Sequence, residues 1–362
     1  MKTVQGLLFS CFICCSISAQ EFSSTLNDYI KQQQQENQIP AIAVSLITPD
    51  TIFSYVNGKV RLTKKERIPQ DAKFHLGSNS KAITSFIAMH LSEQEVISFD
   101  TSFFELFPEL ETASQKAYSN ITLGDLLAHN AQIPAYTKGT ELVKFNNLTG
   151  NTSEKRYAFA KTVLTEKPVK TGTYSNAGYV LAALMLEKAS GKSFKKLLDK
   201  IMNDLDLSYF IGFPNKENDM FPWGHLEQNG SLTSLAPDHS YKLHSFMVSA
   251  GDISMNIEDY SKFIKLNLQG LIGKDNYLGA DDYKKLHFEK PTYAYGWGNI
   301  EKKGQKMSYH DGSAGTYYCH TVLFPEKEIA VVIMANTATE EAVSAIYDIQ
   351  KWISDKPQKA KK

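Results

Sequence analysis

Hydrophobic residues form strand-like runs near both ends of the chain and helix-like repeats between them. Near the N-terminus, the apolar runs 41–47 and 51–56 flank the turn signal Pro49-Asp50 and predict two strands joined by a tight turn. The polar segment 21–38 before them predicts a helix. Near the C-terminus, segments rich in aromatic and β-branched residues predict three or four antiparallel strands and a closing helix, at 293–297, 307–309, 315–324, 328–334 and 340–354.

The middle of the chain follows a helical period instead. Apolar residues recur every three or four positions in 82–91, 177–189 and 258–268, as on one face of a helix. This order predicts an α+β fold, an α/β sandwich in which an antiparallel sheet built from both chain ends is flanked by helices and carries an inserted, mainly helical lobe. Binding sites tend to form between such lobes.

A chain of 362 residues suits one or two lobes around a shared core. We expect a single domain, and its bounds follow from the pattern: 20–355 for the whole domain, about 22–75 and 290–355 for the sheet lobe, and about 82–289 for the helical lobe.

The first residues have the pattern of an export signal. A charged start at Lys2 precedes an apolar core at 7–13, which is too short to span a bilayer, and small residues follow it at 16–19. We expect 1–19 to be cleaved, leaving a periplasmic or secreted protein without a stable membrane span; a buried N-terminal helix is the alternative. A lipid anchor on Cys14 or Cys15 is disfavoured because bulky residues, Phe12 and Ile13, precede them.

Composition narrows the choice of partner. The chain carries 39 basic and 39 acidic residues, so no net field is available to attract nucleic acid or anionic lipid. A small molecule or a short peptide is the expected substrate, and the oligomeric state is left open. Once the signal is removed, Cys319 is the only cysteine, and its strand-like surroundings predict a buried structural thiol. The basic segment 356–362 predicts a disordered tail.

The first candidate for chemistry is a serine one helical turn before a lysine. Ser78 and Lys81 open the predicted helix, where this spacing places the hydroxyl and the amine on one face, within mutual reach. A buried lysine loses its charge readily and can then take the serine proton. The same spacing occurs at Ser193 and Lys196, in an exposed lysine-rich run that we interpret as a solvated helix start.

The second candidate is a tyrosine and an asparagine, Tyr174 and Asn176, in a glycine-flanked turn before an apolar helix. The phenol can relay a proton, and the amide can bind a substrate amide. This pair of residue types also occurs at Tyr55-Val-Asn57 and Tyr118-Ser-Asn120. The third candidate is 309–315, which contains a histidine and small residues between two predicted strands. It predicts either a strand lining the site or a polar hairpin turn.

Together and in this order, the three elements resemble the serine β-lactamase and penicillin-recognising family, in particular its class C-like branch with the related esterases, D-amino-acid peptidases and transesterases. The resemblance covers about residues 25 to 350. Its stretches are Phe74-His-Leu-Gly-Ser-Asn-Ser-Lys81, Ile121-Thr-Leu-Gly-Asp-Leu-Leu-Ala-His129, Tyr174-Ser-Asn-Ala-Gly-Tyr179, Ser249-Ala-Gly-Asp252, Tyr295-Gly-Trp297 and His310-Asp-Gly312.

The resemblance implies the following roles: Ser78 as the nucleophile, Lys81 as its activating base, Tyr174 as the proton relay to the leaving group, Asn176 as a substrate amide contact, His310 in place of the lysine of the third motif, and the backbone N–H groups of Ser78 and Ser313 as the oxyanion hole. It implies no metal and no organic cofactor. His129 is expected to be structural. Four aromatic residues are candidates either for a substrate pocket or for the core: Tyr136, Phe221, Trp223 and Trp297.

Asp311 departs from the family pattern. True class C β-lactamases and D-alanyl-D-alanine peptidases have a hydroxyl residue there, which helps to hold the substrate carboxylate. If ionised and facing the cleft, Asp311 would oppose a carboxylate about 4 Å away by on the order of a few kcal/mol. We therefore expect an ester or amide substrate without a carboxylate at that place, whose acyl group passes to water or an alcohol. The alternatives are a β-lactamase or D-alanyl-D-alanine carboxypeptidase, and a non-catalytic penicillin-binding-like sensor.

Overall fold

The computed structural model describes residues 24–302 and 304–355, so the predicted signal at 1–19 and the predicted tail at 356–362 lie outside the described residues. Residues 24–36 are helical ahead of the first strand. The named elements that follow are β1 (Ala41–Ile47), β2 (Ile52–Gly58), β3 (Lys73–His75), α2 (Ser80–Glu93), α3 (Phe103–Leu106), α4 (Leu123–Leu127), α5 (Gly139–Leu142), α6 (Thr152–Val163), α7 (Asn176–Ser190), α8 (Phe194–Asp204), β4 (Phe210–Ile211), β5 (His225–Gln228), β6 (Ser231–Ser234), α9 (Val248–Gly251), β7 (Ile253–Asn256), α10 (Ile257–Leu271), α11 (Ala280–Phe288), β8 (Gly298–Lys302), β9 (Gln305–Ser313), β10 (Tyr318–Phe324), β11 (Ile329–Ala335) and α12 (Glu340–Asp355).

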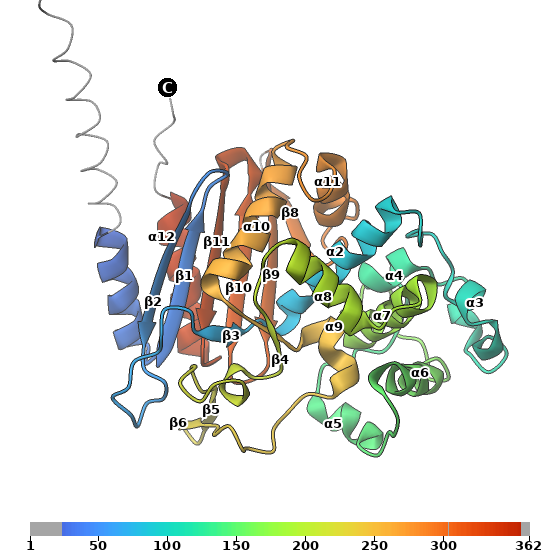
Figure 1. Cartoon of the computed structure of the whole chain (residues 1–362), viewed down its shortest axis with the longest axis horizontal. Coiled ribbons are helices and arrows are strands. Elements are labelled where there is room, and N and C mark those ends of the chain that lie inside the picture. Colours follow the sequence, from blue (N-terminus) through green and yellow to red (C-terminus); the bar gives the residue numbers. More distant parts are fainter. Residues whose placement is uncertain (1–23, 303, 356–362) are drawn as a thin grey trace, which may run out of the picture.

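The described residues form a six-stranded sheet in the order β2-β1-β11-β10-β9-β8, and every neighbouring pair is antiparallel. Strands from the two ends of the chain meet at its centre, where Val44 of β1 lies opposite Ile333 of β11. Figure 1 shows this sheet beside a lobe of helices. The predicted fold class, a sheet built from both chain ends with an inserted helical lobe, is confirmed.

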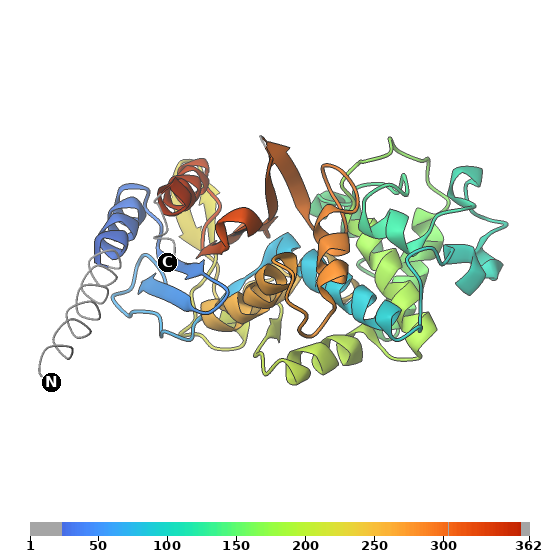
Figure 2. The ribbon, with the colours of Figure 1, turned by 90° about the horizontal axis from the view of Figure 1, so that it is seen from above.

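Helices cover both faces of the sheet (Figure 2). Ile42 and Val44 of β1 pack in the cluster that includes α12, whereas Ala41 and Ala43 face the main core. Because both faces are covered, β1 and β11 are buried along their whole length and read as continuous apolar runs. Helix α10 packs on β1, β2 and β11. Helix α10 lies within the stretch expected to form the helical lobe, 82–289, but it packs on the sheet.

Helix α2 joins the two lobes, because it packs against α7, α8 and α9 of the helical lobe and against α11. Eleven of its residues are buried, from Ser80 to Leu91. Helix α7 is buried on nearly all sides and forms the centre of the helical lobe. Two short sheets, β3-β7-β4 and β5-β6, were not predicted; β4 to β7 lie within the stretch predicted to be mainly helical.

The C-terminal strands differ from their predicted bounds at several places: β9 spans Gln305–Ser313 where 307–309 was predicted, and β10 begins at Tyr318 where 315 was predicted. Residues 293–297 form a loop closed by a hydrogen bond from the Ala294 N–H to the Trp297 carbonyl (2.8 Å), and the strand begins only at Gly298. Cys319 on β10 is completely buried, and burial raises the pKa of its thiol, so the predicted structural cysteine is confirmed. Among the described helices, none combines the length and the hydrophobicity needed to cross a bilayer.

Candidate active site

Ser78 lies where the chain passes from the sheet lobe into α2. Strand β3 ends at His75, and a 3-10 turn over Gly77–Asn79 leads directly into the helix. Gly77 has a φ of +52°, and a Cβ there would lie 2.5 Å from the backbone nitrogen of Ser313, so this turn against β9 requires glycine. Ser78 is partly exposed between buried neighbours. The turn thus presents a single hydroxyl at the boundary between the lobes.

Lys81 lies one turn along α2 and is fully buried. Its Nζ donates hydrogen bonds to Ser78 Oγ (3.2 Å), to Asn176 Oδ1 (2.6 Å) and to the carbonyl oxygen of Ala250 (2.6 Å). Ser78 and Lys81 therefore lie on one helix face within reach of each other, as their spacing predicts.

All three partners of the Lys81 amine are neutral groups, so no carboxylate there compensates a buried positive charge. Burial lowers the pKa of Lys81 well below its ordinary value. In its neutral form the amine has two hydrogens, which it donates to Asn176 and Ala250, and its lone pair faces the Ser78 hydroxyl and can accept the serine proton.

Tyr174 precedes α7, whose first turn is capped by Ser175, the side chain of which accepts the N–H of Gly178. The Lys81 Nζ lies 4.7 Å from the centroid of the Tyr174 ring. The phenol oxygen is buried and has no hydrogen-bond partner among the described residues. Burial raises the pKa of Tyr174, and the nearby Ser78 hydroxyl only partly opposes this. Tyr174 is therefore a protonated donor at neutral pH.

The ring of His129 packs against the ring of Tyr174. Its ring centroid lies 4.3 Å from that of Tyr174 and 4.5 Å from that of Tyr293, and its Nδ1 accepts the backbone N–H of Ser175 (3.1 Å). Burial, with the nearby Lys81, lowers the pKa of His129 well below its ordinary value. The ring is neutral and packs against the site, in agreement with the expected structural role.

His310 on β9 is buried on the sheet side of the site. Its Nε2 lies 3.0 Å from the Tyr293 hydroxyl oxygen and its Nδ1 lies 2.9 Å from the carbonyl oxygen of Asp311. Burial, with the charge of Lys81, lowers the pKa of His310 to about 3. A lysine in this place would be expected to bring a positive charge, whereas His310 is neutral at neutral pH.

The predicted contact between Asp311 and the substrate is wrong. Successive residues of a strand point to opposite faces of the sheet, so Asp311 points away when His310 points in. Its carboxylate accepts hydrogen bonds from His320 Nδ1 (2.7 Å) and from the Tyr347 hydroxyl of α12 (2.9 Å). Burial favours a raised pKa for Asp311, but the His320 and Tyr347 hydrogen bonds outweigh it and the pKa is lowered. The carboxylate faces α12 and cannot contact a substrate in the cleft, although its charge still acts on Tyr174 and His310.

The end of β9 lies directly against the nucleophile turn. A Cβ on Gly312 would lie 2.1 Å from the Leu76 carbonyl oxygen and 2.7 Å from the Ser78 nitrogen, so the predicted small residue is required by close approach. The hydroxyl of Ser313 accepts the N–H of Gly315 (3.0 Å) and is held within its own turn. Residues 310–313 belong to the strand, so the alternative of a polar hairpin turn is wrong.

Asn176 has a role that its sequence did not predict. Its Oδ1 accepts from Lys81, and its Nδ2 donates to the carbonyl oxygen of Tyr136 (3.1 Å). The side chain therefore orients the lysine. Sequence analysis also missed the carbonyl of Ala250 and the hydroxyl of Tyr293. A backbone carbonyl carries no signal of residue type, although Ala250 lies within a stretch that resembles the family.

The four candidate aromatic residues separate into two groups. Trp297 is completely buried and stacks on His287 (centroids 4.3 Å apart), so it belongs to the core. Tyr136 touches the site through its carbonyl group. Trp223 donates to the carbonyl oxygen of Asp219 (2.9 Å), and Phe221 is buried. Neither contacts the groups around Ser78 that are described above.

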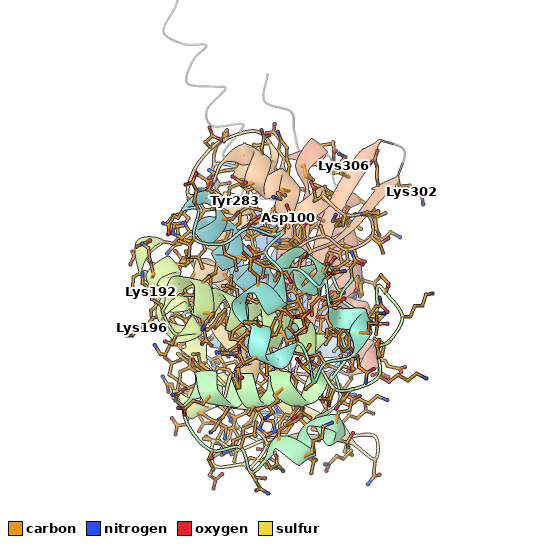
Figure 3. The ribbon with its side chains drawn as sticks, turned by 90° about the vertical axis from the view of Figure 1, so that its right-hand side faces the viewer. Asp100, Lys192, Lys196, Tyr283, Lys302 and Lys306 are labelled. Atoms are coloured by element: carbon orange, nitrogen blue, oxygen red, sulfur yellow. The ribbon has the colours of Figure 1, made fainter. Side chains whose placement is uncertain are left out.

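The second serine–lysine pair is a helix cap. Ser193 Oγ accepts the N–H of Lys196 (3.4 Å) at the start of α8, and Lys196 is exposed. Figure 3 shows Lys192 and Lys196 at the outer edge of the molecule. This pair is the solvated helix start that its lysine-rich surroundings predicted.

A partly exposed serine thus faces a buried amine of lowered pKa, a buried protonated phenol and a strand end, the arrangement required for acyl transfer through a covalent intermediate. A sequence model of the family described as Beta-lactamase matches residues 26–351. The chain belongs to the beta-lactamase family.

Individual relatives agree with this assignment. A beta-lactamase of Providencia stuartii is 25% identical, and the match covers 98% of both chains. Among solved structures, the octameric penicillin-binding protein homologue from Pyrococcus abyssi superposes with a TM-score of 0.71 at 22% identity, over 93% of this chain and 78% of that one. The class C beta lactamase from Rhodobacter sphaeroides also gives 0.71, at 17% identity, over 91% and 99%. The chain has the fold of this family of serine hydrolases.

Proposed function

We propose that this protein is a serine hydrolase or acyltransferase that forms an acyl-enzyme on Ser78 from an ester or amide substrate. One observation carries the proposal: a fully buried Lys81 amine, with a pKa well below its ordinary value and no acidic partner, lies 3.2 Å from the Ser78 hydroxyl. A lysine kept for structure alone would be expected to be paired with a carboxylate or exposed.

The pKa directions assign the two proton carriers. Lys81 has the lowered pKa and serves as the base, because Tyr174 has a raised pKa and keeps its proton. Lys81 takes the Ser78 proton while Oγ attacks the substrate carbonyl carbon. The backbone N–H groups of Ser78 and Ser313 bind the resulting oxyanion.

Collapse of the tetrahedral intermediate breaks the bond to the leaving group. Tyr174 donates its proton to that group and recovers one from the Lys81 ammonium, so the protons balance. Water or an alcohol then attacks the acyl-enzyme and gives its proton to the same pair, which passes a proton to Ser78 Oγ as the bond to the acyl carbon breaks. Asn176 has a second Nδ2 hydrogen beyond the one donated to Tyr136, and we assign it to the substrate amide or acyl oxygen.

The charges around the site support a substrate without a carboxylate on the β9 side. Residues 309–313 of β9 include no lysine and no arginine, and the charge of Asp311 acts on both Tyr174 and His310. His310 is itself neutral. With no fixed cation to hold a carboxylate, β-lactams and D-alanyl-D-alanine peptides lack the partner that their binding needs.

A matched pair of substrates tests this assignment. We expect the purified protein to turn over a short-chain ester of a neutral alcohol at least ~10-fold faster, in kcat/KM, than the ester of the same acyl group with a carboxylate-bearing alcohol. Turnover of nitrocefin or of a D-Ala-D-Ala peptide faster than the neutral ester would overturn it and favour a β-lactamase or carboxypeptidase. His310→Lys is the matched variant. Because it adds a positive charge beside the cleft, it should reduce the difference in kcat/KM between the neutral ester and the carboxylate-bearing ester.

A further inference from the structure

A histidine and an aspartate lie buried beneath the nucleophile turn, outside the acyl-transfer machinery described above. His75 on β3 is completely buried, and its Nε2 lies 3.1 Å from Asp252 Oδ1. Its Nδ1 lies 3.1 Å from the backbone nitrogen of Gly77. The imidazole packs against Phe213 and Tyr317, whose ring centroids lie 4.8 Å and 6.1 Å away.

The two hydrogen bonds fix which nitrogen carries the proton. A backbone N–H can only donate, so Nδ1 of His75 accepts from Gly77. The proton of the neutral ring is then on Nε2 and is donated to the Asp252 carboxylate, which can accept it. The aspartate thus selects the tautomer that can hold Gly77.

The pair connects the two halves of the site. Gly77 is the residue immediately before Ser78, and its position against Ser313 determines how the turn meets β9. Asp252 follows α9, in which the Ala250 carbonyl oxygen accepts the Lys81 Nζ at 2.6 Å. A displacement of this pair would therefore shift the serine, the amine and the β9 edge relative to one another.

We propose that His75 and Asp252 are positioning residues, which set Ser78 against Lys81 and against the N–H groups of the oxyanion hole. This inference rests on the proposed acyl-enzyme function. His75 is completely buried behind the turn and has its two nitrogens occupied by Gly77 and Asp252, so it acts on Ser78 only through the backbone.

Two isosteric variants separate the two hydrogen bonds. In His75→Asn the amide oxygen takes the place of Nδ1 and can still accept from Gly77, whereas in His75→Gln the amide takes the place of Nε2 and keeps only Asp252. We would measure phosphonylation of Ser78 by a fluorophosphonate in each variant, as a stand-in for acylation, separating its maximal rate from the half-saturating concentration. The Asn variant should stay within ~5-fold of wild type, and the Gln variant should fall ~10- to 100-fold in rate with little change in half-saturation.

A buried histidine elsewhere gives the control for a loss of stability. His287 is also completely buried, with its nitrogens 2.6 Å from Ser308 Oγ and 3.0 Å from Asn267 Oδ1. His287→Gln should lower the Tm as His75→Gln does and leave acylation near the wild-type rate. Asp252→Ala provides a second route to the same defect, and its acylation rate should fall without a comparable change in half-saturation.

The outcomes separate this inference from the function on which it rests. If wild type forms no adduct, the proposed function fails and the inference fails with it. If wild type is acylated and the Gln variant reacts as fast as the Asn variant, the positioning role is overturned while the function stands. Equal rate losses in His75→Gln and His287→Gln would also overturn it, because the effect would then follow stability alone.

Discussion

Replacing Lys81 by methionine is expected to lower kcat/KM for ester hydrolysis by ~10³- to 10⁴-fold, which is about 4–5.5 kcal/mol of transition-state stabilisation. The methionine fills a similar volume but cannot accept the Ser78 proton at the 3.2 Å contact. Tyr174 cannot replace it, because burial raises the pKa of the phenol and keeps it protonated. The measurement is kcat/KM for one neutral ester, with circular dichroism to show that the variant is folded.

The pH profile of the wild type gives a second readout of the same group. Lys81 must be neutral to act as a base, so activity should fall as the pH drops through its pKa. Since burial lowers that pKa, the acidic limb should lie well below the ordinary lysine range, and the enzyme should be active at neutral pH. A Lys81→Met variant that retains wild-type kcat/KM, or a wild type that is active only above the ordinary lysine pKa, would contradict the assignment.

Tyr174→Phe should have an effect that depends on the leaving group. We expect a loss of ~10²- to 10³-fold with amides and alkyl esters, whose leaving groups need a proton. With a p-nitrophenyl ester the loss should be much smaller, because that phenolate leaves unprotonated. The ratio between the two substrate types is the measured quantity, and it is independent of the amount of folded enzyme.

Tyr179→Phe is the matched control for that prediction. Tyr179 is also a buried tyrosine of the helical lobe, but its hydroxyl donates to the Leu127 carbonyl oxygen at 2.7 Å. Removing this hydroxyl should lower stability and leave the ratio between the two substrate types unchanged. An equal loss for both leaving groups in Tyr174→Phe would show that Tyr174 is not the proton donor.

Local pattern was enough to predict the parts of the site that lie within one element. Ser78 and Lys81 are one turn apart on α2, so helix geometry alone brings them together. Tyr174 was found because it stands at a turn before an apolar helix, where Ser175 provides the cap. The antiparallel sheet followed from the strand-like composition of both chain ends.

The direction of the Asp311 side chain was not predicted from the local sequence pattern. Residues 309–315 were interpreted either as a strand lining the site or as a polar hairpin turn, so the alternation of side chains along a strand was not applied to them. Once 305–313 is known to be one strand, the inward position of His310 requires Asp311 to face α12. A substrate without a carboxylate is therefore still expected, but for a different reason. The argument is now that His310 carries no charge, and no longer that Asp311 repels a carboxylate.

Other features depend on contacts between residues that are far apart in the sequence. Asn176 meets Lys81 across 95 positions, and Asp252 meets His75 across 177. Helix α10 has the same periodicity as the helices of the inserted lobe, and only its packing on β1 assigns it to the sheet. Periodicity identifies a buried face but not the partner that covers it.

Intact-mass spectrometry after treatment with a fluorophosphonate tests the central claim most directly. We expect a single adduct on the wild-type protein, located at Ser78 by peptide mapping, and no adduct on Ser78→Ala. Absence of an adduct on the wild type would favour a non-catalytic penicillin-binding-like sensor. An unchanged adduct on Ser78→Ala would place the nucleophile elsewhere, and either result would contradict catalysis at Ser78.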